Sequence, residues 1–168
     1  MIFVTVGTDS RGFERLIRKV DKLKEKGAIK EKVTMQIAGT EYTPKFCKWF
    51  RYCKKNKIKK LTENSSLVIS HCGVGSILQS IESDKLTIFV PRLKKFEEAV
   101  DNHQLEFAKN LGKYKKFFFV YDVEKLENAI KKARSLRLKK SIKNKEENSM
   151  IKLIWAYIQK WKNENTLN

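Results

Sequence analysis

The sequence has 168 residues, and the 41% that are hydrophobic suffice for the core of one domain. No apolar run reaches the roughly 20 residues of a membrane-spanning helix, and the three cysteines lack the spacing of a zinc site or a disulfide framework. The net charge of +18 favours anionic partners, and the N-terminus enters a strand pattern without a basic leader, so we expect a cytoplasmic protein.

Short apolar runs and amphipathic segments alternate along the chain. The short runs predict strands at residues 2–6, 33–38, 58–61, 67–70, 86–90 and 117–121. Apolar residues three and four positions apart predict helices at residues 13–23, 44–53, 77–82, 101–111 and 123–133. This alternation, with short joints, predicts an α/β fold with a doubly wound parallel sheet.

Three loops of the predicted sheet follow strands at their carboxyl ends, where sheets of this kind bind ligands. They cover residues 7–12, 70–76 and 91–104, and all three are rich in small or polar side chains. We therefore expect them to converge on one crevice.

The loop at residues 70–76, Ser-His-Cys-Gly-Val-Gly-Ser, joins a buried strand to a helix. Gly73 and Gly75 allow a tight turn and a close approach of the backbone to a ligand. The helix offers unpaired N–H groups and the positive end of its dipole, which both favour a phosphate. We predict a small phosphorylated ligand, in the first place a nucleotide, although a plain tight turn would give the same pattern.

The C-terminal part of the chain, residues 137–168, differs from the rest. Between Lys131 and Lys162 there are eleven Lys or Arg residues and two acidic residues. Helical spacing relates a set of apolar residues, namely Met150, Leu153, Ile154, Tyr157, Ile158 and Trp161. We expect a ligand-binding domain at residues 1–136, then a basic linker and an amphipathic helix. This helix would pack on its own domain, dock on a partner protein or lie on a membrane surface.

Three segments together resemble a known family of enzymes. They are Phe-Val-Thr-Val-Gly-Thr at residues 3–8, the loop at residues 70–76, and Asp-Asn-His-Gln at residues 101–104. In this order they are similar to short, single-domain glycosyltransferases related to the C-terminal half of the MurG-type transferase, which forms lipid II. The nearest likenesses are PssE-type exopolysaccharide and capsule subunits, and the catalytic subunit of the eukaryotic transferase that extends dolichol-linked N-acetylglucosamine. The resemblance covers residues 1 to about 133.

The resemblance implies a fold and a reaction. The fold is the nucleotide-sugar-binding half of a GT-B enzyme, a Rossmann-like α/β domain. The reaction moves a hexose (galactose, glucose or N-acetylglucosamine) from a UDP-sugar to a lipid-linked acceptor, at the cytoplasmic face of the membrane, in the synthesis of a cell-surface polysaccharide or glycan. The resemblance implies no metal and no other cofactor. It also implies a PssD-type membrane-anchored partner subunit that binds the acceptor and holds the complex at the membrane.

The resemblance assigns donor-binding roles to individual residues. The diphosphate would lie against four residues at the start of the helix, namely Gly73, Val74, Gly75 and Ser76. His71 would contact phosphate or sugar, or else be a buried structural histidine. Gln79 occupies a position where relatives commonly have a Glu that binds the ribose hydroxyls, and Glu82 is the alternative carboxylate.

The other two loops supply the remaining candidates. Gly7 and Thr8 begin the first loop and would contact the donor, unless they form a bare turn. The segment of Asn102, His103 and Gln104 resembles the part of relatives that contacts the donor-sugar hydroxyls. The alternatives are a helix N-cap for Asn102 and a plain helix surface for His103 and Gln104.

Catalysis is the least defined part of the sequence interpretation. Asp9 and His103 are the catalytic candidates, and Asp9 would act as an acid, a base or an acceptor contact. No residue is an evident general base for the acceptor hydroxyl. A partner subunit that supplies the acceptor side is the simplest explanation.

Other functions fit parts of the sequence. The charge, and aromatic residues near Arg51 such as Trp49 and Tyr52, suit a nucleic-acid-binding protein. Its usual motifs are missing, so we expect no nucleic-acid partner. A UDP-sugar epimerase of GT-B architecture would need both halves in one chain, and a non-catalytic UDP-sugar-binding module is the third alternative.

Overall fold

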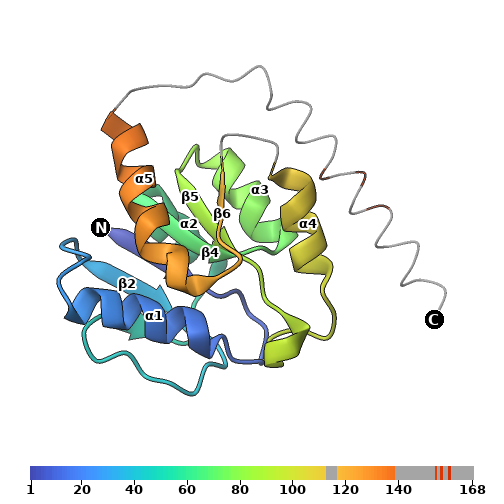
Figure 1. Ribbon diagram of the computed structural model, residues 1–168, viewed down its shortest axis with the longest axis horizontal. Coiled ribbons are helices and arrows are strands. Elements are labelled where there is room, and N and C mark those ends of the chain that lie inside the picture. The colour runs from blue at the N-terminus through green and yellow to red at the C-terminus, as the bar shows by residue number, and fades with distance from the viewer. Residues whose placement is uncertain (113–116, 139–153, 155, 157–158, 160–168) are drawn as a thin grey trace.

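A computed structural model describes residues 1–112 and 117–138, together with Ile154, Ala156 and Gln159. A six-stranded parallel sheet in the order β3-β2-β1-β4-β5-β6 forms its centre (Figure 1). The strands are β1 (Ile2–Thr5), β2 (Val33–Gln36), β3 (Lys48–Phe50), β4 (Leu67–His71), β5 (Thr87–Val90) and β6 (Phe118–Phe119). The α-helices are α1 (Glu14–Glu25), α2 (Lys55–Glu63), α3 (Val74–Glu82), α4 (His103–Leu111) and α5 (Leu126–Leu138). The predicted α/β fold with a doubly wound parallel sheet is confirmed.

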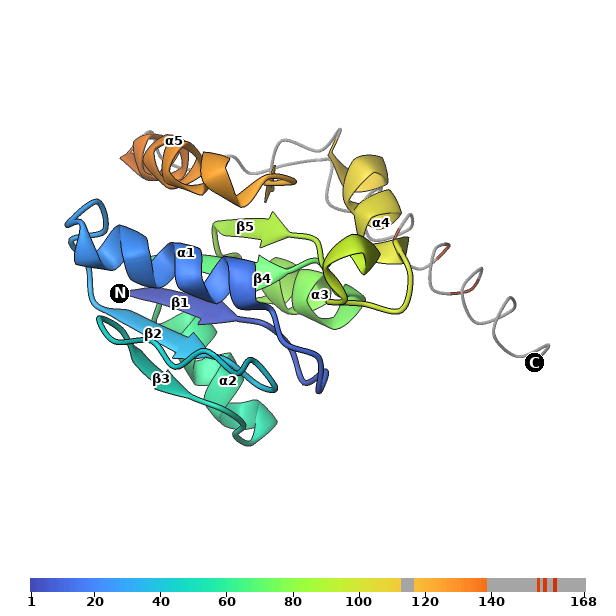
Figure 2. The same cartoon turned by 60° about the horizontal axis from the view of Figure 1, so that its bottom comes forward.

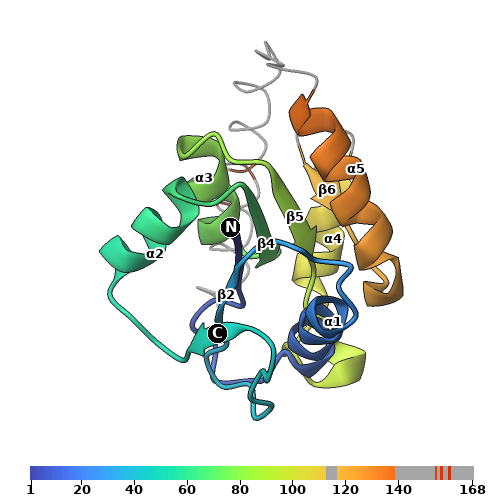
Figure 3. The ribbon, with the colours of Figure 1, turned by 90° about the vertical axis from the view of Figure 1, so that its left-hand side faces the viewer.

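Helices cover both faces of the sheet (Figure 2 and Figure 3). On one face α1 and α5 bury Leu16, Ile17 and Ile130 against alternate strand residues such as Val4 and Ile88. Because successive side chains of a strand point to opposite faces, the neighbouring residue Phe89 faces the other layer. There it packs with residues of α3 and α4, namely Ile77, Ile81, Phe107, Ala108 and Leu111.

The strand order determines where in the sheet a ligand site is expected. β1 lies between β2 and β4 and pairs with both in parallel, with Thr5 opposite Gln36 on one side and Ser70 on the other. The chain leaves β1 for α1 on one face and leaves β4 for α3 on the opposite face (Figure 3). The carboxyl ends of β1 and β4 therefore form a switch point of the topology, where doubly wound sheets bind their ligands.

Two predicted elements between residues 44 and 63 are wrong. The helix expected at residues 44–53 is a loop followed by the edge strand β3, and the strand expected at residues 58–61 lies inside α2. Asp21, a fully buried residue of α1, holds this loop in place. Its carboxylate accepts hydrogen bonds from the backbone N–H groups of Lys45 (2.8 Å) and Phe46 (2.9 Å). These bonds direct the chain into β3, whose backbone pairs with β2.

The expected C-terminal helix falls mostly outside the described residues. Ile154, Ala156 and Gln159 are helical, and Ala156 and Gln159 are exposed. Ile154 is fully buried in the apolar cluster formed by α3, α4 and β5. Among the described residues, no helix is both long enough and apolar enough to cross a membrane.

Candidate functional site

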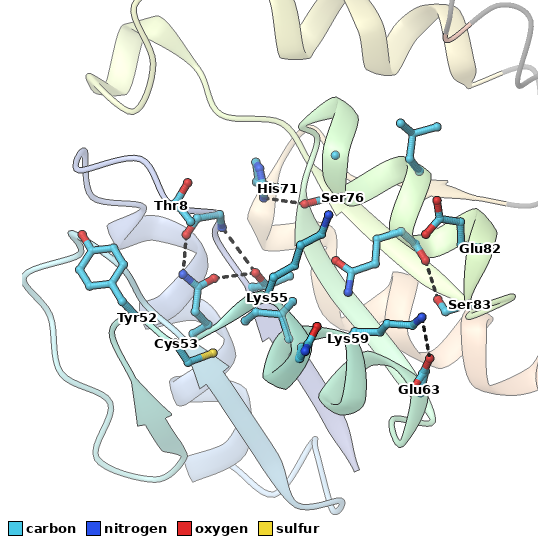
Figure 4. A pocket seen from close by; sticks show the side chains of 18 residues that line it. Thr8, Tyr52, Cys53, Lys55, Lys59, Glu63, His71, Ser76, Glu82 and Ser83 are labelled. Atoms are coloured by element: carbon cyan, nitrogen blue, oxygen red, sulfur yellow. Dashed lines mark hydrogen bonds and ion pairs between the residues drawn. The ribbon is translucent and has the colours of Figure 1, made fainter.

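A cleft of about 930 Å³ opens at the carboxyl edge of the sheet, between the loops after β1 and β4 and the helices α2 and α3 (Figure 4). Several residues expected to bind the donor line it, namely Gly7, Thr8, His71, Gly75, Ser76 and Gln79. Glu82, the alternative ribose contact, also lines it. The structure thus brings the first and second of the three predicted loops together around one cleft.

The glycine loop ends in the N-terminus of α3. Gly73 is the N-cap residue, and no side chain caps the first turn. The first intrahelical bond runs from the N–H of Ile77 to the carbonyl of Gly73 at 3.1 Å, so the N–H groups of the first turn precede it and have no partner within the helix. A side chain at Gly75 would meet nothing within 4 Å. The approach to this helix end is therefore open, which suits an anion.

Gly73 has a different role from Gly75. A Cβ atom at Gly73 would lie 2.5 Å from Nε2 of His71, and one at Gly7 would lie 2.7 Å from the same ring. The His71 ring is thus held between two glycines, one from each loop. Gly7 also has φ +80°, a conformation that favours glycine.

The imidazole of His71 is an uncharged group in the site. Burial, and next the nearby guanidinium of Arg92, lower the pKa of His71 to about 4, so the imidazole is neutral at pH 7. Its Nδ1 lies 3.3 Å from the hydroxyl of Ser76. The ring is packed between two glycines and also lines the cleft, so both predicted roles of His71 stay open.

Gln36 is a site residue that sequence reasoning missed. At the end of β2, its buried side chain accepts a hydrogen bond from the Thr5 hydroxyl at 2.6 Å. Its amide nitrogen donates to the carbonyls of Gly7 and Arg51. Gln36 therefore ties together the chain segments that leave β1 and β3. The sequence signal that could have identified Gln36 is a polar residue at the end of an apolar strand pattern.

Arg92 is a second missed residue, and it joins the first loop to the third. It is 1% exposed, and its guanidinium donates to the carbonyls of Val6 (2.8 Å), Arg11 (3.1 Å) and Gly12 (3.1 Å). Burial lowers the pKa of Arg92 from its usual value. A basic residue after Pro91 in a Lys-rich sequence gave no sign of such burial.

Gln79 and Glu82 are residues of α3 that line the cleft. The amide nitrogen of Gln79 donates to the hydroxyl of Thr62 on α2 at 3.3 Å. This bond fixes the orientation of the amide and leaves its oxygen as the acceptor for a ligand hydroxyl.

The third loop lies outside this cleft. The carbonyl oxygen of the Gln104 side chain accepts from the N–H of Arg92 (3.2 Å), and that of Asn102 accepts from the N–H of Lys94 (3.2 Å). Asn102 is the N-cap residue of α4 without a side-chain cap bond. Nδ1 of His103 is in hydrogen-bond contact with the carboxylate of Asp101, which also accepts from the backbone N–H of His103 at 3.0 Å.

Asp9, the other catalytic candidate, is exposed in the first loop. It forms an ion pair with Arg11 at 3.2 Å. Neither Asp9 nor His103 is among the residues that line the cleft, so any catalytic role of either requires a reactant that extends beyond it.

The wall of the cleft opposite α3 was not predicted. Tyr52 and Cys53 from the loop after β3, and Lys55, Asn56 and Lys59 from α2, line it. Because residues 58–61 were expected to form a strand, the first turn of α2 was not recognised as part of the site. Within the described parts of the chain, no group of three or more His, Cys, Asp or Glu side chains is placed to hold a metal ion.

Comparison with known proteins decides the family. Residues 1–155 match the model of the glycosyltransferase family 28 C-terminal domain. The chain belongs to this family. The match covers all three segments that carried the resemblance in the sequence, and two of these segments line the cleft.

Curated relatives agree with this membership. The chain is 35% identical over 129 residues to the UDP-N-acetylglucosamine transferase subunit ALG13 of Homo sapiens. It is 33% identical over 75 residues to the ALG13 subunit of Candida albicans. These matches cover 70% and 45% of the chain, but the chain spans only 11% and 24% of those relatives.

The fold has a counterpart among solved glycosyltransferases. The crystal structure of the glycotransferase of kitacinnamycin superposes with a TM-score of 0.55 and 10% identity, over 93% of this chain and 38% of that one. The domain therefore shares the Rossmann-like α/β fold of that glycosyltransferase, and its family is the glycosyltransferase family 28 C-terminal domain.

Proposed function

We propose that this chain is the donor-binding, catalytic subunit of a two-component glycosyltransferase. It takes a hexose from a UDP-sugar and transfers it to a lipid-linked acceptor in the synthesis of a cell-surface polysaccharide or glycan. The observation that carries the proposal is the uncapped N-terminus of α3, which opens at Gly75 into a cleft large enough for a nucleotide. Because the curated relatives are named as UDP-N-acetylglucosamine transferase subunits, N-acetylglucosamine is the first donor sugar to test.

The cleft stabilises the departing diphosphate in this proposal. As the bond between the sugar C1 and the diphosphate oxygen breaks, the electron pair stays on that oxygen and the negative charge there increases. The N–H groups of Val74, Gly75 and Ser76 are fixed before the reaction, so they stabilise the transition state more than the ground state. The proposal requires no metal and no other cofactor. The oxygen of Gln79 accepts from a ribose hydroxyl, and Glu82 lies one turn further along the helix.

A partner subunit supplies the acceptor side. The proposal assigns the acceptor and its general base to a membrane-anchored partner of the PssD type, which places this chain at the cytoplasmic membrane face. In this proposal, Asp9 and the segment Asn102, His103 and Gln104 contact the part of the donor sugar or of the acceptor that extends beyond the cleft. The word "subunit" in the names of the curated relatives supports a partner.

Calorimetric titration of the full chain tests the donor proposal. UDP and UDP-N-acetylglucosamine should bind, whereas ADP and GDP should bind weakly or not at all. Co-expression with the neighbouring reading frame should then give transfer from a labelled UDP-sugar to a membrane lipid. Absence of UDP binding by the folded chain would overturn the proposal, and full transfer activity by the chain alone would overturn the two-component part of it.

A further inference from the structure

The predicted phosphate-binding loop lacks a positive charge. Its donors are backbone N–H groups and the Ser76 hydroxyl, and the depressed pKa of His71 leaves that ring neutral at pH 7. A nucleoside diphosphate carries negative charge on both phosphate groups. A cation within reach would therefore add a charge-assisted contact that the loop itself does not provide.

The arginines near the loop are already engaged. Arg92 is buried and donates to three backbone carbonyls of the first loop and its strand. Arg11 forms an ion pair with Asp9 at 3.2 Å. Neither guanidinium is among the groups that line the cleft.

Two lysines of α2 line the cleft, and they differ in their partners. Lys59 lies 3.9 Å from the carboxylate of Glu63, which is also a cleft residue. Lys55 takes part in none of the ion pairs found among the described residues. Figure 4 shows the Lys55 side chain running across the cleft toward Ser76, while Lys59 points toward Glu63.

The topology explains why Lys55 reaches the glycine loop. It is the first residue of α2, which follows β3 at the carboxyl edge of the sheet. The N-terminus of α3 follows β4 at the same edge. The two helix ends therefore face the same cleft, and a long lysine side chain spans the distance between them.

We propose that Lys55 binds the diphosphate of the nucleotide from the side opposite the N-terminus of α3. The diphosphate then lies between the N–H groups of Gly75 and Ser76 and the ammonium group of Lys55. This inference rests on the proposed UDP-sugar function and adds to it the cation that the family motif does not contain. It concerns binding of the substrate and of the UDP product, and it requires no additional chemical step.

Binding measurements on the full chain test this role. Lys55→Met should weaken UDP binding about five- to tenfold, as expected for loss of one partly solvated charge-assisted contact. Uridine binding should not change, because uridine has no diphosphate. Lys55→Arg should retain most of the affinity for UDP. Lys60→Met, on the same helix but outside the cleft, is the matched control and should bind like the wild type.

The outcomes separate this inference from the function on which it rests. If the wild type binds UDP and Lys55→Met binds it equally well, Lys55 is not a diphosphate ligand and the inference is wrong. Equal loss of UDP and uridine affinity would also contradict it. If the folded wild type binds neither UDP nor a UDP-sugar, the proposed function itself falls and the inference falls with it. Circular dichroism of each variant shows that folding is unchanged.

Discussion

At the scale of single residues, His71 connects the two loops of the cleft. Its ring fills the space that side chains at Gly7 and Gly73 would need, and its Nδ1 lies next to the Ser76 hydroxyl. A neutral imidazole accepts or donates a hydrogen bond without repelling Lys55 or Arg92. The position therefore favours a neutral polar ring over a charged side chain.

The protonation of His71 gives a prediction for stability against pH. Its pKa is about 4 in the folded chain against 6.5 as the ordinary value, so between these pH values the unfolded chain binds more protons. The free energy of unfolding should therefore fall as the pH is lowered from 6.5 toward 4. In NMR spectra, the His71 ring signals, assigned with a His103→Gln variant, should keep their neutral positions at pH 5.5. A midpoint of 6 or above would contradict the burial of this ring.

The two glycines of the loop should respond differently to the same substitution. Gly73→Ala places a methyl group 2.5 Å from the His71 ring, so unfolding by urea should show a loss of about 1–3 kcal/mol. Gly75→Ala meets open space in the first turn of α3. It should leave stability unchanged or raise it by about 0.5–1 kcal/mol while it weakens UDP binding. Unchanged UDP affinity in Gly75→Ala would contradict a close approach of the diphosphate.

At the scale of elements, the sequence predicted those parts in which pattern and packing agree. β1, β4, α3 and α4 have regular apolar spacing, and each was predicted within a few residues of its observed position. α2 has few apolar residues, and the only buried residue of this helix is the polar Thr62. The short apolar pattern within this helix instead predicted a strand at residues 58–61. Because of that error, the sequence did not predict the wall of the cleft that contains Lys55, nor Tyr52 in the preceding loop.

The edge strand β3 depends on one carboxylate far from it in sequence. Asp21 accepts hydrogen bonds from Lys45, Phe46 and the hydroxyl of Tyr42, and this last bond raises the pKa of Tyr42 to about 12. Such a tertiary contact leaves no local signal in the residues 42–50. This is why a helix at Pro44 was a reasonable but wrong expectation.

Substitution of Asp21 tests this account of β3. Asp21→Ala leaves three donors without their buried acceptor, so we expect a loss of about 2–4 kcal/mol in the free energy of unfolding. Glu25→Gln, an exposed acid at the end of the same helix, should change it by less than about 0.5 kcal/mol. Urea denaturation followed by circular dichroism measures both. Equal stabilities of the two variants would contradict the role given to Asp21.

At the scale of the whole molecule, the family domain accounts for the fold, and its sheet places the cleft at the carboxyl edge. Two of the three loops predicted to converge do so, and Arg92 ties the third to the first. Arg92 was not predictable, because its partners are backbone carbonyls of distant segments. For Gln36 the sequence offered one signal, a polar residue at the end of an apolar strand pattern. Docking of the basic C-terminal region on a partner or a membrane stays a prediction, because most of that region lies outside the described residues.

The central claim is that the nucleotide diphosphate lies at the N-terminus of α3. Titration of the ¹⁵N-labelled full chain with UDP, followed by amide NMR, tests it most directly. We predict that the largest shifts occur at Gly73, Val74, Gly75 and Ser76, with a smaller shift at Lys55. Shifts confined to other surfaces, or no shifts at saturating UDP, would contradict the claim.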